Sequence, residues 1–494
     1  MVMISSEAGQ KIIRILYDQN MWWSTQSVPN TLSKPFKRRD FYVLKDKILE
    51  KEITAVVGPR QIGKTTILYQ LIEHLINDKK VDPRRILYLS FDYPYLTTIT
   101  ETPMNDIFEI YPTQILHEPL QELNDVIYVF LDEVCKLKDW SRILKGWYDL
   151  KYPITFVVSD SSVADVLKGS SESLVGRISP YTMLSMKFVD VVRYHEKNNN
   201  LDRLFNTVNR NLRRSFSDSI KTSNSKTFYN EIKNAYTTLV PYEDKLKIYL
   251  QDYFLKDGYP ELLDIEALTS CAEKLRTYLN LTIYKDVVRI FGVRDPKALE
   301  ELVTLLADAS PQRVNYDRLS KTLSIKRDTL IKYLNYLESI FMIYRAEFYS
   351  KSRASRIRKQ KKIYLSNTGL RNALIGTLNE GLLSDNAELG KVAEMLVCEH
   401  CKRLKFCLEP VPEPESFYWK TSQGEEVDII IELFRKPVAI ESKYSNEIHK
   451  RDLKGLYQFL KEYEGSFGIV ITKDRIDLRD NIIYMPLWLF LLMC

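Results

Sequence analysis

One glycine-rich run carries the most specific chemistry of this sequence. The run GPRQIGKTT meets the pattern G-x-x-x-x-G-K-[ST] and stands between an apolar, strand-like stretch and a helix-like stretch. Its glycines let backbone N–H groups wrap phosphates, its lysine reaches the β- and γ-phosphates, and the next hydroxyl holds Mg²⁺. The pattern therefore predicts a site for ATP and Mg²⁺. The predicted nucleotide-binding residues are Gly58, Pro59, Arg60, Gln61, Ile62, Gly63, Lys64, Thr65 and Thr66.

Two adjacent acids follow a second apolar strand. In VIYVFLDEV the strand end projects Asp132 toward the metal ion and Glu133 toward an attacking water. An Asp-Glu pair is also common in acidic surface turns, but its position after the phosphate loop favours a functional pair, in which Asp132 binds nucleotide and metal and Glu133 is catalytic. The pair predicts ATP hydrolysis rather than binding alone.

The next strand and the segment after it hold two further candidates. Ser159 in SDSS would contact the γ-phosphate or the water, whereas Ser161 or Ser162 equally suits a helix N-cap. Arg177 in LVGR would stabilise transition-state charge within its own chain or across a subunit interface of a homo-oligomer. A solvated surface arginine is the alternative.

A third group of charges stands near the end of the chain, in VAIESKY and the stretch before it. Glu441 and Lys443 share one face of a strand, and Asp428 begins the neighbouring strand of a hairpin. Two such acids would hold Mg²⁺, or Mn²⁺ as an alternative, against a scissile phosphate while Lys443 steadies the attacking hydroxide. The spacing E-x-K is common by itself, so two solvated charges are the alternative interpretation.

A basic segment precedes these acids. Residues 351–362, KSRASRIRKQKK, contain seven basic residues and no acid, which suits sequence-independent contact with the DNA backbone. The surrounding pattern of two short helices and two strands predicts a winged helix-turn-helix, with Lys326, Arg327 and Lys332 on a recognition helix at 325–339. DNA is therefore the expected partner; a solvated loop and a protein-docking module are the alternatives.

Composition limits the class of protein. A chain of 494 residues with a formal net charge of +6 and 45% hydrophobic residues is typical of a globular protein with about three domains. Six scattered cysteines fit a reducing, cytoplasmic environment, and the pair in CEHC lacks the second ligand pair of a zinc site. The N-terminus has no secretory pattern, and YMPLWLFLLMC is too short to span a bilayer. We therefore expect no membrane partner and a C-terminal core element.

The order of elements predicts an α/β fold. Strand-like runs alternate with helices from Glu52, which indicates the parallel sheet of a P-loop NTPase. Residues 191–245 have few apolar positions and are interpreted as a polar helix with loops, followed by amphipathic helices. The expected divisions are an N-terminal segment at 1–40, a P-loop ATPase domain at 41–190, a polar linker and helical subdomain at 191–300, the winged helix-turn-helix at 301–365, and a small mixed α/β domain at 366–494.

Four motifs in this order resemble those of a known family. QNMWW, GPRQIGKTT, VFLDEV and LVGRISPYTM are similar to the motifs of archaeal and bacterial AAA-type ATPases. The C-terminal half of these proteins combines a winged helix with a domain of unknown function related to restriction endonucleases. The family carries Thr-Gly-Ser after the fourth strand where this chain has SDSS, a departure that bears on the sensor role of Ser159.

The charges within residues 366–494 also resemble the PD-(D/E)xK nuclease superfamily. The resemblance implies that Asp428 is the first metal ligand, Glu441 the second and Lys443 the general stabiliser, with Glu394 an accessory acid on the preceding helix. The expected protein is thus a Mg²⁺-dependent ATPase that couples nucleotide state to DNA binding and processing. The alternative is a nucleotide-gated regulatory switch whose C-terminal module binds DNA or protein without cleaving it.

Overall fold

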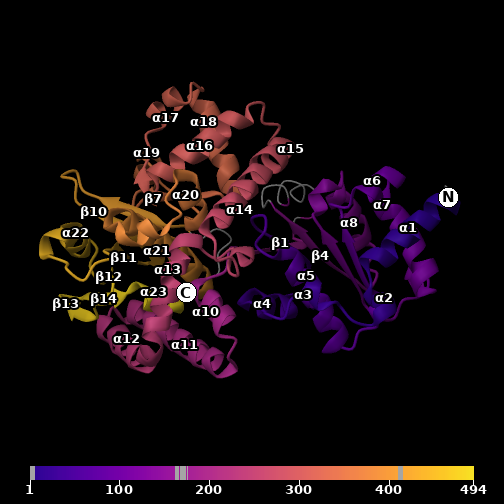
Figure 1. Cartoon of the computed structure of the whole chain (residues 1–494), viewed down its shortest axis with the longest axis horizontal. Coiled ribbons are helices and arrows are strands. Elements are labelled where there is room, and N and C mark those ends of the chain that lie inside the picture. The colour runs from indigo at the N-terminus through magenta and orange to yellow at the C-terminus, as the bar shows by residue number, and fades with distance from the viewer. Residues whose placement is uncertain (1–5, 162–165, 167–173, 175, 410–414) are drawn as a thin grey trace. The chain divides into compact units, whose positions relative to one another are not determined.

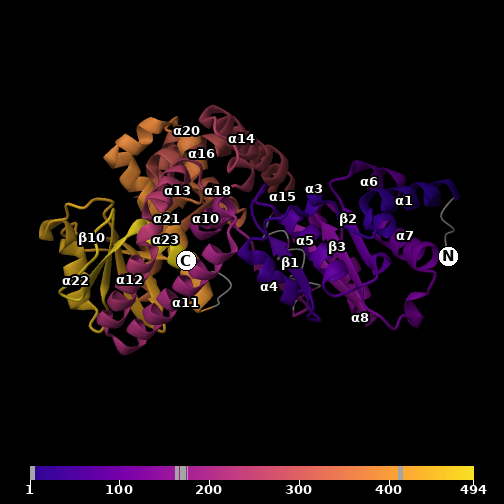
Figure 2. The same ribbon diagram turned by 60° about the horizontal axis from the view of Figure 1, so that its bottom comes forward.

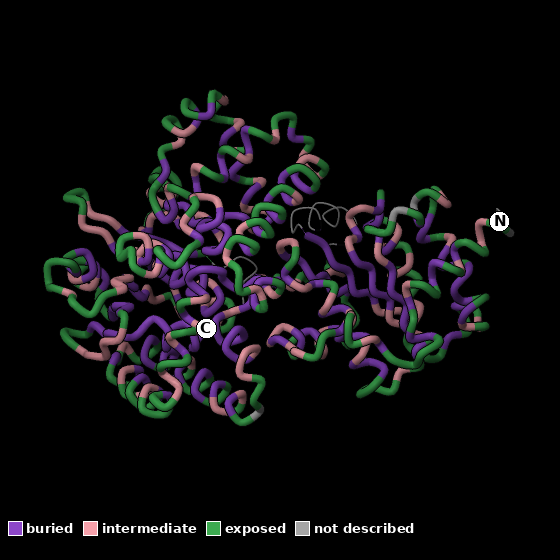
Figure 3. The backbone as a smooth tube through the Cα atoms, in the orientation of Figure 1, coloured by how far each residue is buried: buried purple, intermediate pink, exposed green. Residues whose placement is uncertain are grey.

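The chain divides into two compact units, which we describe separately. The computed structural model describes residues 6–161, 166, 174, 176–409 and 415–494. The N-terminal unit is Met1–Leu184 and the C-terminal unit is Ser185–Cys494 (Figure 1). Figure 3 shows buried residues gathered in the middle of each unit and exposed residues along its outer segments. Each unit therefore has its own core.

A five-stranded parallel sheet forms the core of the N-terminal unit, which confirms the expected α/β fold. Three of its strands are nearly continuous runs of buried apolar residues, as a parallel sheet with both faces covered requires. Because all strands run the same way, their carboxyl ends meet at one edge, where ligands bind in such folds. In spatial order the strands are β2 (Ile86–Ser90), β3 (Ile127–Asp132), β4 (Ile154–Asp160), β1 (Ile53–Val57) and β5 (Ile178–Thr182).

Helices surround this sheet (Figure 2). Helix α5 (Lys64–Asn77) begins directly after the glycine-rich loop that follows β1, and it buries Ile67, Leu68 and Leu71. This strand, loop and helix order is the context that the phosphate-loop pattern requires. The other α-helices described in the unit are α1 (Ser6–Gln19), α2 (Trp22–Thr25), α3 (Asn30–Ser33), α4 (Arg39–Lys47), α6 (Pro94–Ile99), α7 (Pro103–Ile110) and α8 (Trp140–Asp149).

The motif QNMWW protects an edge of the sheet. Strand β2 lies at the edge, so its outer backbone groups need partners other than a strand. The Asn20 side chain donates from Nδ2 to the Tyr88 carbonyl (3.0 Å) and accepts the Tyr88 N–H at Oδ1 (2.6 Å). The indole N–H groups of Trp22 and Trp23 both donate to the Ile86 carbonyl. This motif therefore stabilises the strand that stands beside β3.

Two long helices form most of residues 191–245, where a polar helix with loops is expected. Helices α11 (Asn199–Thr222) and α12 (Ser225–Leu239) pack against each other (Figure 1). Their few apolar residues recur at three and four spacing and are buried, among them Leu212, Phe216 and Phe228. The expected helix is thus present, and most of the expected loops are helical instead, because a helix needs only one apolar stripe to pack, however polar its other faces are.

Amphipathic helices precede and follow this pair. Helix α10 (Phe188–Glu196) comes before it, and the helices after it match the expected three and four spacing of apolar residues. The latter are α13 (Glu243–Lys256), α14 (Leu268–Asn280), α15 (Val288–Phe291), α16 (Pro296–Ala309) and, later in the chain, α20 (Thr368–Ile375).

Residues 312–365 contain the two short helices and two strands that the sequence predicts. Helix α18 buries Leu330, Leu334 and Leu337, so its other face is free to carry polar residues. Strand β8 pairs antiparallel with both β6 and β7. The elements are β6 (Gln312–Arg313), α17 (Tyr316–Thr322), α18 (Arg327–Ser339), β7 (Ile343–Phe348), α19 (Arg353–Arg358) and β8 (Lys362–Leu365).

A single nine-stranded sheet continues from these strands into the C-terminal residues. Strand β7 pairs in parallel with β9 (Phe417–Lys420), so the expected division at residue 365 falls inside one sheet. The strand order is β13-β14-β12-β11-β10-β9-β7-β8-β6. The remaining strands are β10 (Glu426–Leu433), β11 (Lys436–Ser442), β12 (Gly468–Thr472), β13 (Asp477–Arg479) and β14 (Ile482–Pro486).

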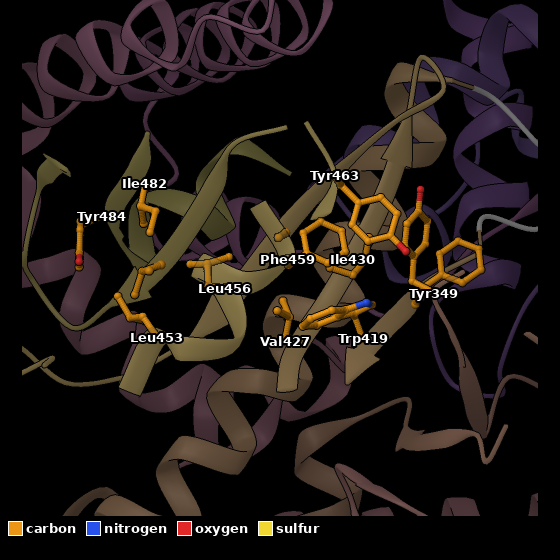
Figure 4. Close-up of a cluster of buried hydrophobic side chains, with 13 residues drawn as sticks. Tyr349, Trp419, Val427, Ile430, Leu453, Leu456, Phe459, Tyr463, Ile482 and Tyr484 are labelled. Atoms are coloured by element: carbon orange, nitrogen blue, oxygen red, sulfur yellow. The ribbon is translucent and has the colours of Figure 1, made fainter. Parts of the chain in front are cut away.

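Helices pack on the middle of this sheet. Helix α22 (Lys454–Glu462) contacts β10 and β11 over a buried cluster in which Phe459 meets Trp419 edge to face (Figure 4). Helix α21 (Asn386–Leu408) also contacts β10 and β11. The apolar C-terminal stretch forms α23 (Leu487–Met493), which is buried throughout, as expected for a core element. No helix in the described part of the chain is long and apolar enough to cross a membrane.

Candidate functional site

The glycine-rich loop has the backbone that a phosphate loop needs. Gly63 has φ +91°, and Gln61 has φ +61°, so the loop turns through the left-handed region before α5 begins. At Gly58 a Cβ would lie 1.9 Å from the Met183 carbonyl oxygen, so only glycine allows β5 to approach the loop this closely. The loop thus presents its backbone at the N-terminus of α5, where the helix dipole favours anions.

Lys64 is folded back onto this loop. Its ammonium donates to the carbonyl oxygens of Gly58 (2.9 Å) and Pro59 (2.8 Å), and the residue is buried. Burial lowers the pKa of Lys64, while Glu133 and Asp132 act in the opposite direction. The ammonium therefore lies within the loop that would surround the phosphates.

Three hydroxyl groups converge on Asp132 at the end of β3. Thr65 Oγ1 donates to Asp132 Oδ2 (2.7 Å), the Tyr88 hydroxyl donates to the same oxygen (3.0 Å), and Ser159 Oγ donates to Oδ1. Asp132 is only 4% exposed, whereas Thr65 is exposed, so the pair opens to solvent on the threonine side. A hydroxyl and an aspartate are the protein oxygens that hold Mg²⁺ in phosphate loops, so Thr65 and Asp132 are candidate ligands.

Tyr88 is a site residue that sequence reasoning missed. It lies on β2, beside β3 in the sheet, and only this pairing brings its hydroxyl to Asp132. Its ring packs against Tyr69 and Trp22. A tyrosine within a buried strand is an ordinary core residue by its pattern, so no local signal distinguishes it.

Glu133 has the features of a catalytic base. Its backbone takes the left-handed conformation, with φ +55°, directly after β3 ends. Within the described residues its Oε2 is buried and accepts no hydrogen bond. Burial raises the pKa of Glu133, against the effect of Lys64. A carboxylate in this state can accept a proton from a water molecule.

The end of β4 adds Ser159 and a second missed residue, Asp160. Ser159 Oγ accepts the Glu133 N–H (3.3 Å) and so bonds to both neighbouring acids. Asp160 is fully buried; its Oδ2 accepts the Cys135 N–H (3.0 Å) and its carbonyl accepts the Gly58 N–H (3.3 Å). Asp160 therefore ties β4 to the start of the phosphate loop. Of the two serines considered as helix caps, Ser162 lies outside the described residues.

Arg177 is not brought to this site. Its carbonyl accepts the Ile53 N–H (2.8 Å) at the first residue of β1, and the phosphate loop follows the opposite end of that strand. Its Nε donates to Asp149 Oδ1 (3.0 Å) at the end of α8. This position gives no support to a role within the same chain, and a role across a subunit interface stays a prediction.

The acids of the C-terminal unit lie together. Asp428 on β10 and Glu441 on β11 are antiparallel neighbours, with the Asp428 N–H donating to Glu441 Oε2 (3.3 Å) and the Ser442 N–H donating to Asp428 Oδ2 (3.0 Å). Lys443 Nζ lies 2.8 Å from Glu441 Oε1. We call Glu394, Asp428, Glu441 and Lys443, with Lys362 described next, the acid cluster.

Lys362 is the member that sequence reasoning missed. Its ammonium lies 2.6 Å from Glu394 Oε1 and 3.5 Å from Asp428 Oδ1. The Tyr364 hydroxyl, two residues later on β8, donates to Glu394 Oε1 (2.9 Å). In the sequence Lys362 belongs to a basic run predicted to contact DNA, and only the pairing of β8 within the sheet reveals its other role.

Burial gives the acid cluster unusual protonation. Burial, and then the charge of Asp428, raise the pKa of Glu394 to about 7 and that of Glu441 to about 8, against the neighbouring lysines. Within the described ranges, no three histidine, cysteine or acidic side chains form a group that could hold a metal ion. The role of Asp428 and Glu441 as metal ligands therefore stays a prediction, which would need one or two carboxylates and waters to hold Mg²⁺.

The basic segment 351–362 is not uniformly exposed, which corrects its interpretation as one DNA-binding surface. Lys362 is buried, Lys361 Nζ lies 2.5 Å from Glu347 Oε1, and the Arg356 guanidinium stacks on Phe417. Local charge did not reveal these contacts because their partners come from distant strands. The exposed basic residues of the segment are Lys351, Arg353, Arg358 and Lys359.

The predicted recognition helix carries its three basic residues on exposed positions. Lys326, Arg327 and Lys332 are all exposed at or after the start of α18. Arg327 Nε lies 3.1 Å from Asp317 Oδ1 on α17.

The cysteines of CEHC are buried within α21, together with His400, whose Nδ1 contacts the Leu396 carbonyl (2.9 Å).

Family comparisons agree with the nucleotide site. A family described as an AAA domain matches residues 50–192, so this part of the chain is similar to AAA-type ATPase domains, and the match supports nucleotide-binding ATPase activity. Two families described as domains of unknown function, DUF8612 and DUF4143, match residues 248–381 and 389–490. The second match includes the acids Glu394, Asp428 and Glu441.

Relatives extend along most of the chain. An uncharacterized protein of Methanocaldococcus jannaschii is 28% identical over 485 residues, which cover 95% of this chain and 92% of that protein. A second uncharacterized protein of the same organism is 21% identical over 422 residues, covering 84% and 80%. A Saccharomyces cerevisiae Hsp104–ADP complex aligns with 79% of this chain and 60% of its own at 13% identity, with a TM-score of only 0.28.

Proposed function

We propose that this chain is a Mg²⁺-dependent ATPase whose nucleotide state governs the binding and processing of DNA by its C-terminal unit. One observation carries the hydrolytic part: Glu133, directly after Asp132, keeps its buried Oε2 without a hydrogen-bond partner among the described residues, and Lys136 Nζ lies 3.9 Å from this oxygen. A general base needs such an acceptor close to the reacting group. The AAA-domain match supports the same conclusion.

The binding residues would act before the chemical step. The backbone N–H groups of the loop and the Lys64 ammonium would hold the β- and γ-phosphates. Thr65 and Asp132 would hold Mg²⁺, which neutralises charge on the phosphates when bound. Lys64 would exchange its bonds to the Gly58 and Pro59 carbonyls for bonds to phosphate oxygens, so ATP would replace contacts that the loop makes with itself.

The hydrolytic residues would then orient and deprotonate water. Glu133 would accept the proton as the water attacks the γ-phosphate. Ser159 donates to Asp132 and accepts from the Glu133 N–H, so it would hold the two acids at a constant distance from each other. In this role Ser159 would bond to both acids without contacting the phosphate.

The DNA-directed part is supported by the order of elements in residues 296–365. A helix, a short strand, two helices and two antiparallel strands, with the short helix α19 between these two strands, support a winged helix-turn-helix. Exposed basic residues stand at the start of α18 and between β7 and β8, where the DNA backbone would be met. Asp428, Glu441 and Lys443 would supply the chemistry of a metal-dependent phosphodiesterase.

A regulatory switch is the second candidate, and one observation favours it. The ammonium of Lys362 lies between Glu394 and Asp428, so part of the acid cluster is already neutralised by the protein itself. Such a domain would recognise DNA or a protein without cutting, and slow ATP hydrolysis would reset its state.

The test is cleavage of supercoiled and linear DNA with Mg²⁺ or Mn²⁺, with and without ATP. We compare the wild type with Asp428→Asn and Lys64→Ala, and measure ATP hydrolysis of all three proteins. Cutting that is lost in Asp428→Asn supports the nuclease, and loss in Lys64→Ala supports control by ATP. Normal hydrolysis with no cutting of either substrate would leave the switch as the function.

A further inference from the structure

Helix α19 is attached to the sheet by one of its arginines. The Arg356 guanidinium packs over the Phe417 ring, 4.7 Å from its centroid, and its Nε donates to the Ser350 carbonyl (2.6 Å). The Lys361 ammonium donates to the Arg356 carbonyl (2.9 Å) in the last turn of the helix. Arg356 therefore faces the sheet, and its contacts fix which side of α19 faces outward.

The outward side of α19 presents an apolar pair between two arginines. At about 100° per residue, Ala354 and Ile357 come to the middle of this side, and the two arginines, Arg353 and Arg358, come to its edges. Exposure agrees with this arrangement, since all of these residues are exposed, whereas Arg356 is only partly exposed. Ile357 is 67% exposed, more than any other large hydrophobic residue in the described part of the chain.

The outward side also carries positive charge that the protein leaves without a counter-charge. The acids that contact the basic segment pair with its inward cations, Arg356, Lys361 and Lys362. Among the described residues, neither Arg353 nor Arg358 forms an ion pair, and the segment itself contains no acid. Together with the exposed lysines on either side of α19, four cations surround the exposed isoleucine. A polyanion is the partner that complements such a surface.

An apolar side chain among cations is an arrangement that suits the minor groove of DNA. Arginines are attracted by the negative potential of a narrow minor groove, and an inserted isoleucine can unstack two base pairs and bend the duplex by about 20–90°. The groove is about 6 Å wide and a helix about 10 Å across, so only the outward side chains of α19 would enter. A membrane surface would require a larger apolar face than Ala354 and Ile357 offer.

We propose that the outward side of α19 binds the minor groove of duplex DNA and that Ile357 inserts between base pairs, so the protein bends the DNA that it binds. This inference rests on the proposed DNA binding by residues 296–365. It adds the groove, the side chain that unstacks the bases, and a change in the shape of the DNA.

The experiment measures energy transfer between fluorophores at the two ends of a duplex of about 20 base pairs with easily kinked TA steps at its centre. The full chain is added to saturation, with ATP and without it, and fluorescence anisotropy of the same duplex measures binding. The wild type is expected to raise the energy transfer, because bending brings the two ends closer together.

Two variants of Ile357 and one control locate the effect. Ile357→Ala is expected to bind within about 10-fold of the wild-type affinity and to leave the energy transfer at the value of the free duplex. Ile357→Leu should keep the bend, because leucine can also insert between base pairs. Ile248→Ala, which changes a similarly exposed isoleucine on α13, is the matched control and should bend the duplex as the wild type does.

The outcomes separate this inference from the DNA binding on which it rests. Wild-type binding with unchanged energy transfer, or equal bending by the wild type and Ile357→Ala, would overturn the insertion of Ile357 and leave DNA binding in place. If the wild type does not bind the duplex with or without ATP, the DNA part of the proposed function fails, and this inference fails with it. Binding to phosphatidylserine vesicles that is lost in Ile357→Ala would then assign α19 to a membrane surface.

Discussion

The first prediction concerns a buried ion pair that holds the first residue of the C-terminal unit. Glu399 and Arg403 stand one turn apart on α21, and the Arg403 Nε donates to Glu399 Oε1 (2.8 Å). Arg403 Nη1 also donates to the Ser185 carbonyl (2.9 Å), while Ser185 Oγ donates to Asp257 Oδ1 (3.2 Å). The change Glu399→Gln would leave the guanidinium buried without its counter-charge.

Two independent arguments give the size of the effect. Removing one partner of a buried ion pair costs about 3–5 kcal/mol of unfolding free energy. Burial acts to raise the pKa of Glu399, but Arg403 and His400 outweigh burial and lower this pKa to about 2. The difference from the ordinary value of 4.5 corresponds to about 3 kcal/mol at pH 7. Both arguments therefore predict that Glu399→Gln destabilises the unit by about 3 kcal/mol.

The same pKa fixes the pH dependence. Because the folded-state pKa is lowered, the unfolded chain binds more protons between about pH 2 and 4.5, so stability falls as the pH falls through this range. The contribution of Glu399 is fully present above about pH 5 and falls to about 1 kcal/mol at pH 3. The wild type should therefore lose its advantage over Glu399→Gln as the solution is acidified.

The assay must separate the two units, because a chain with two cores does not unfold in one step. We would follow hydrogen exchange of peptides from α21 across a urea series, and use peptides from β3 as an internal reference. Glu462→Gln, an exposed glutamate on α22, is the control and should change the midpoint little. A deficit below about 1 kcal/mol at pH 7, or one of equal size at pH 3 and pH 7, would refute the reasoning.

Three further predictions concern the proposed sites. Glu133→Gln should retain ATP affinity and slow hydrolysis at least about 100-fold, because the amide cannot accept the proton; nucleotide binding and phosphate release measure this. Tyr88→Phe should raise the Mg²⁺ concentration for half-maximal hydrolysis about 10- to 100-fold, because Asp132 loses one of its orienting bonds. Arg358→Ala or Lys359→Ala should each lower the slope of log DNA affinity against log salt by about 0.9, as measured by fluorescence anisotropy.

Each of these three predictions has a result that would contradict it. Equal losses of binding and hydrolysis in Glu133→Gln would assign it to the fold rather than to proton transfer. The half-exposed Tyr128 on β3 provides a control, and a similar Mg²⁺ shift in Tyr128→Phe would remove the specific role of Tyr88. If neither Arg358→Ala nor Lys359→Ala changes the salt slope, these two residues of the basic segment do not contact the DNA backbone.

Part of the fold follows from local pattern. Apolar runs such as ITAVV and the periodic leucines of α18 form the expected strand and helix because each buries one face or both. Residues 191–245 show the limit of this reasoning, since a polar composition concealed a regular apolar stripe. Local pattern could not predict the continuous nine-stranded sheet either, because pairing between β7 and β9 joins residues about 70 positions apart.

The sequence alone determined the phosphate loop, with Lys64 and Thr65, and the acids at the strand ends, because their chemistry depends on spacing along one strand or one turn. Tertiary structure decided which groups surround them. Tyr88 contacts Asp132 only because β2 pairs with β3. Lys362 belongs to a basic run in the sequence, but it contacts Glu394 because β8 is part of the larger sheet. The physical reason is that a buried charge is neutralised by the groups that the fold places within a few ångströms of it. The distances between such groups cannot be derived from the local sequence.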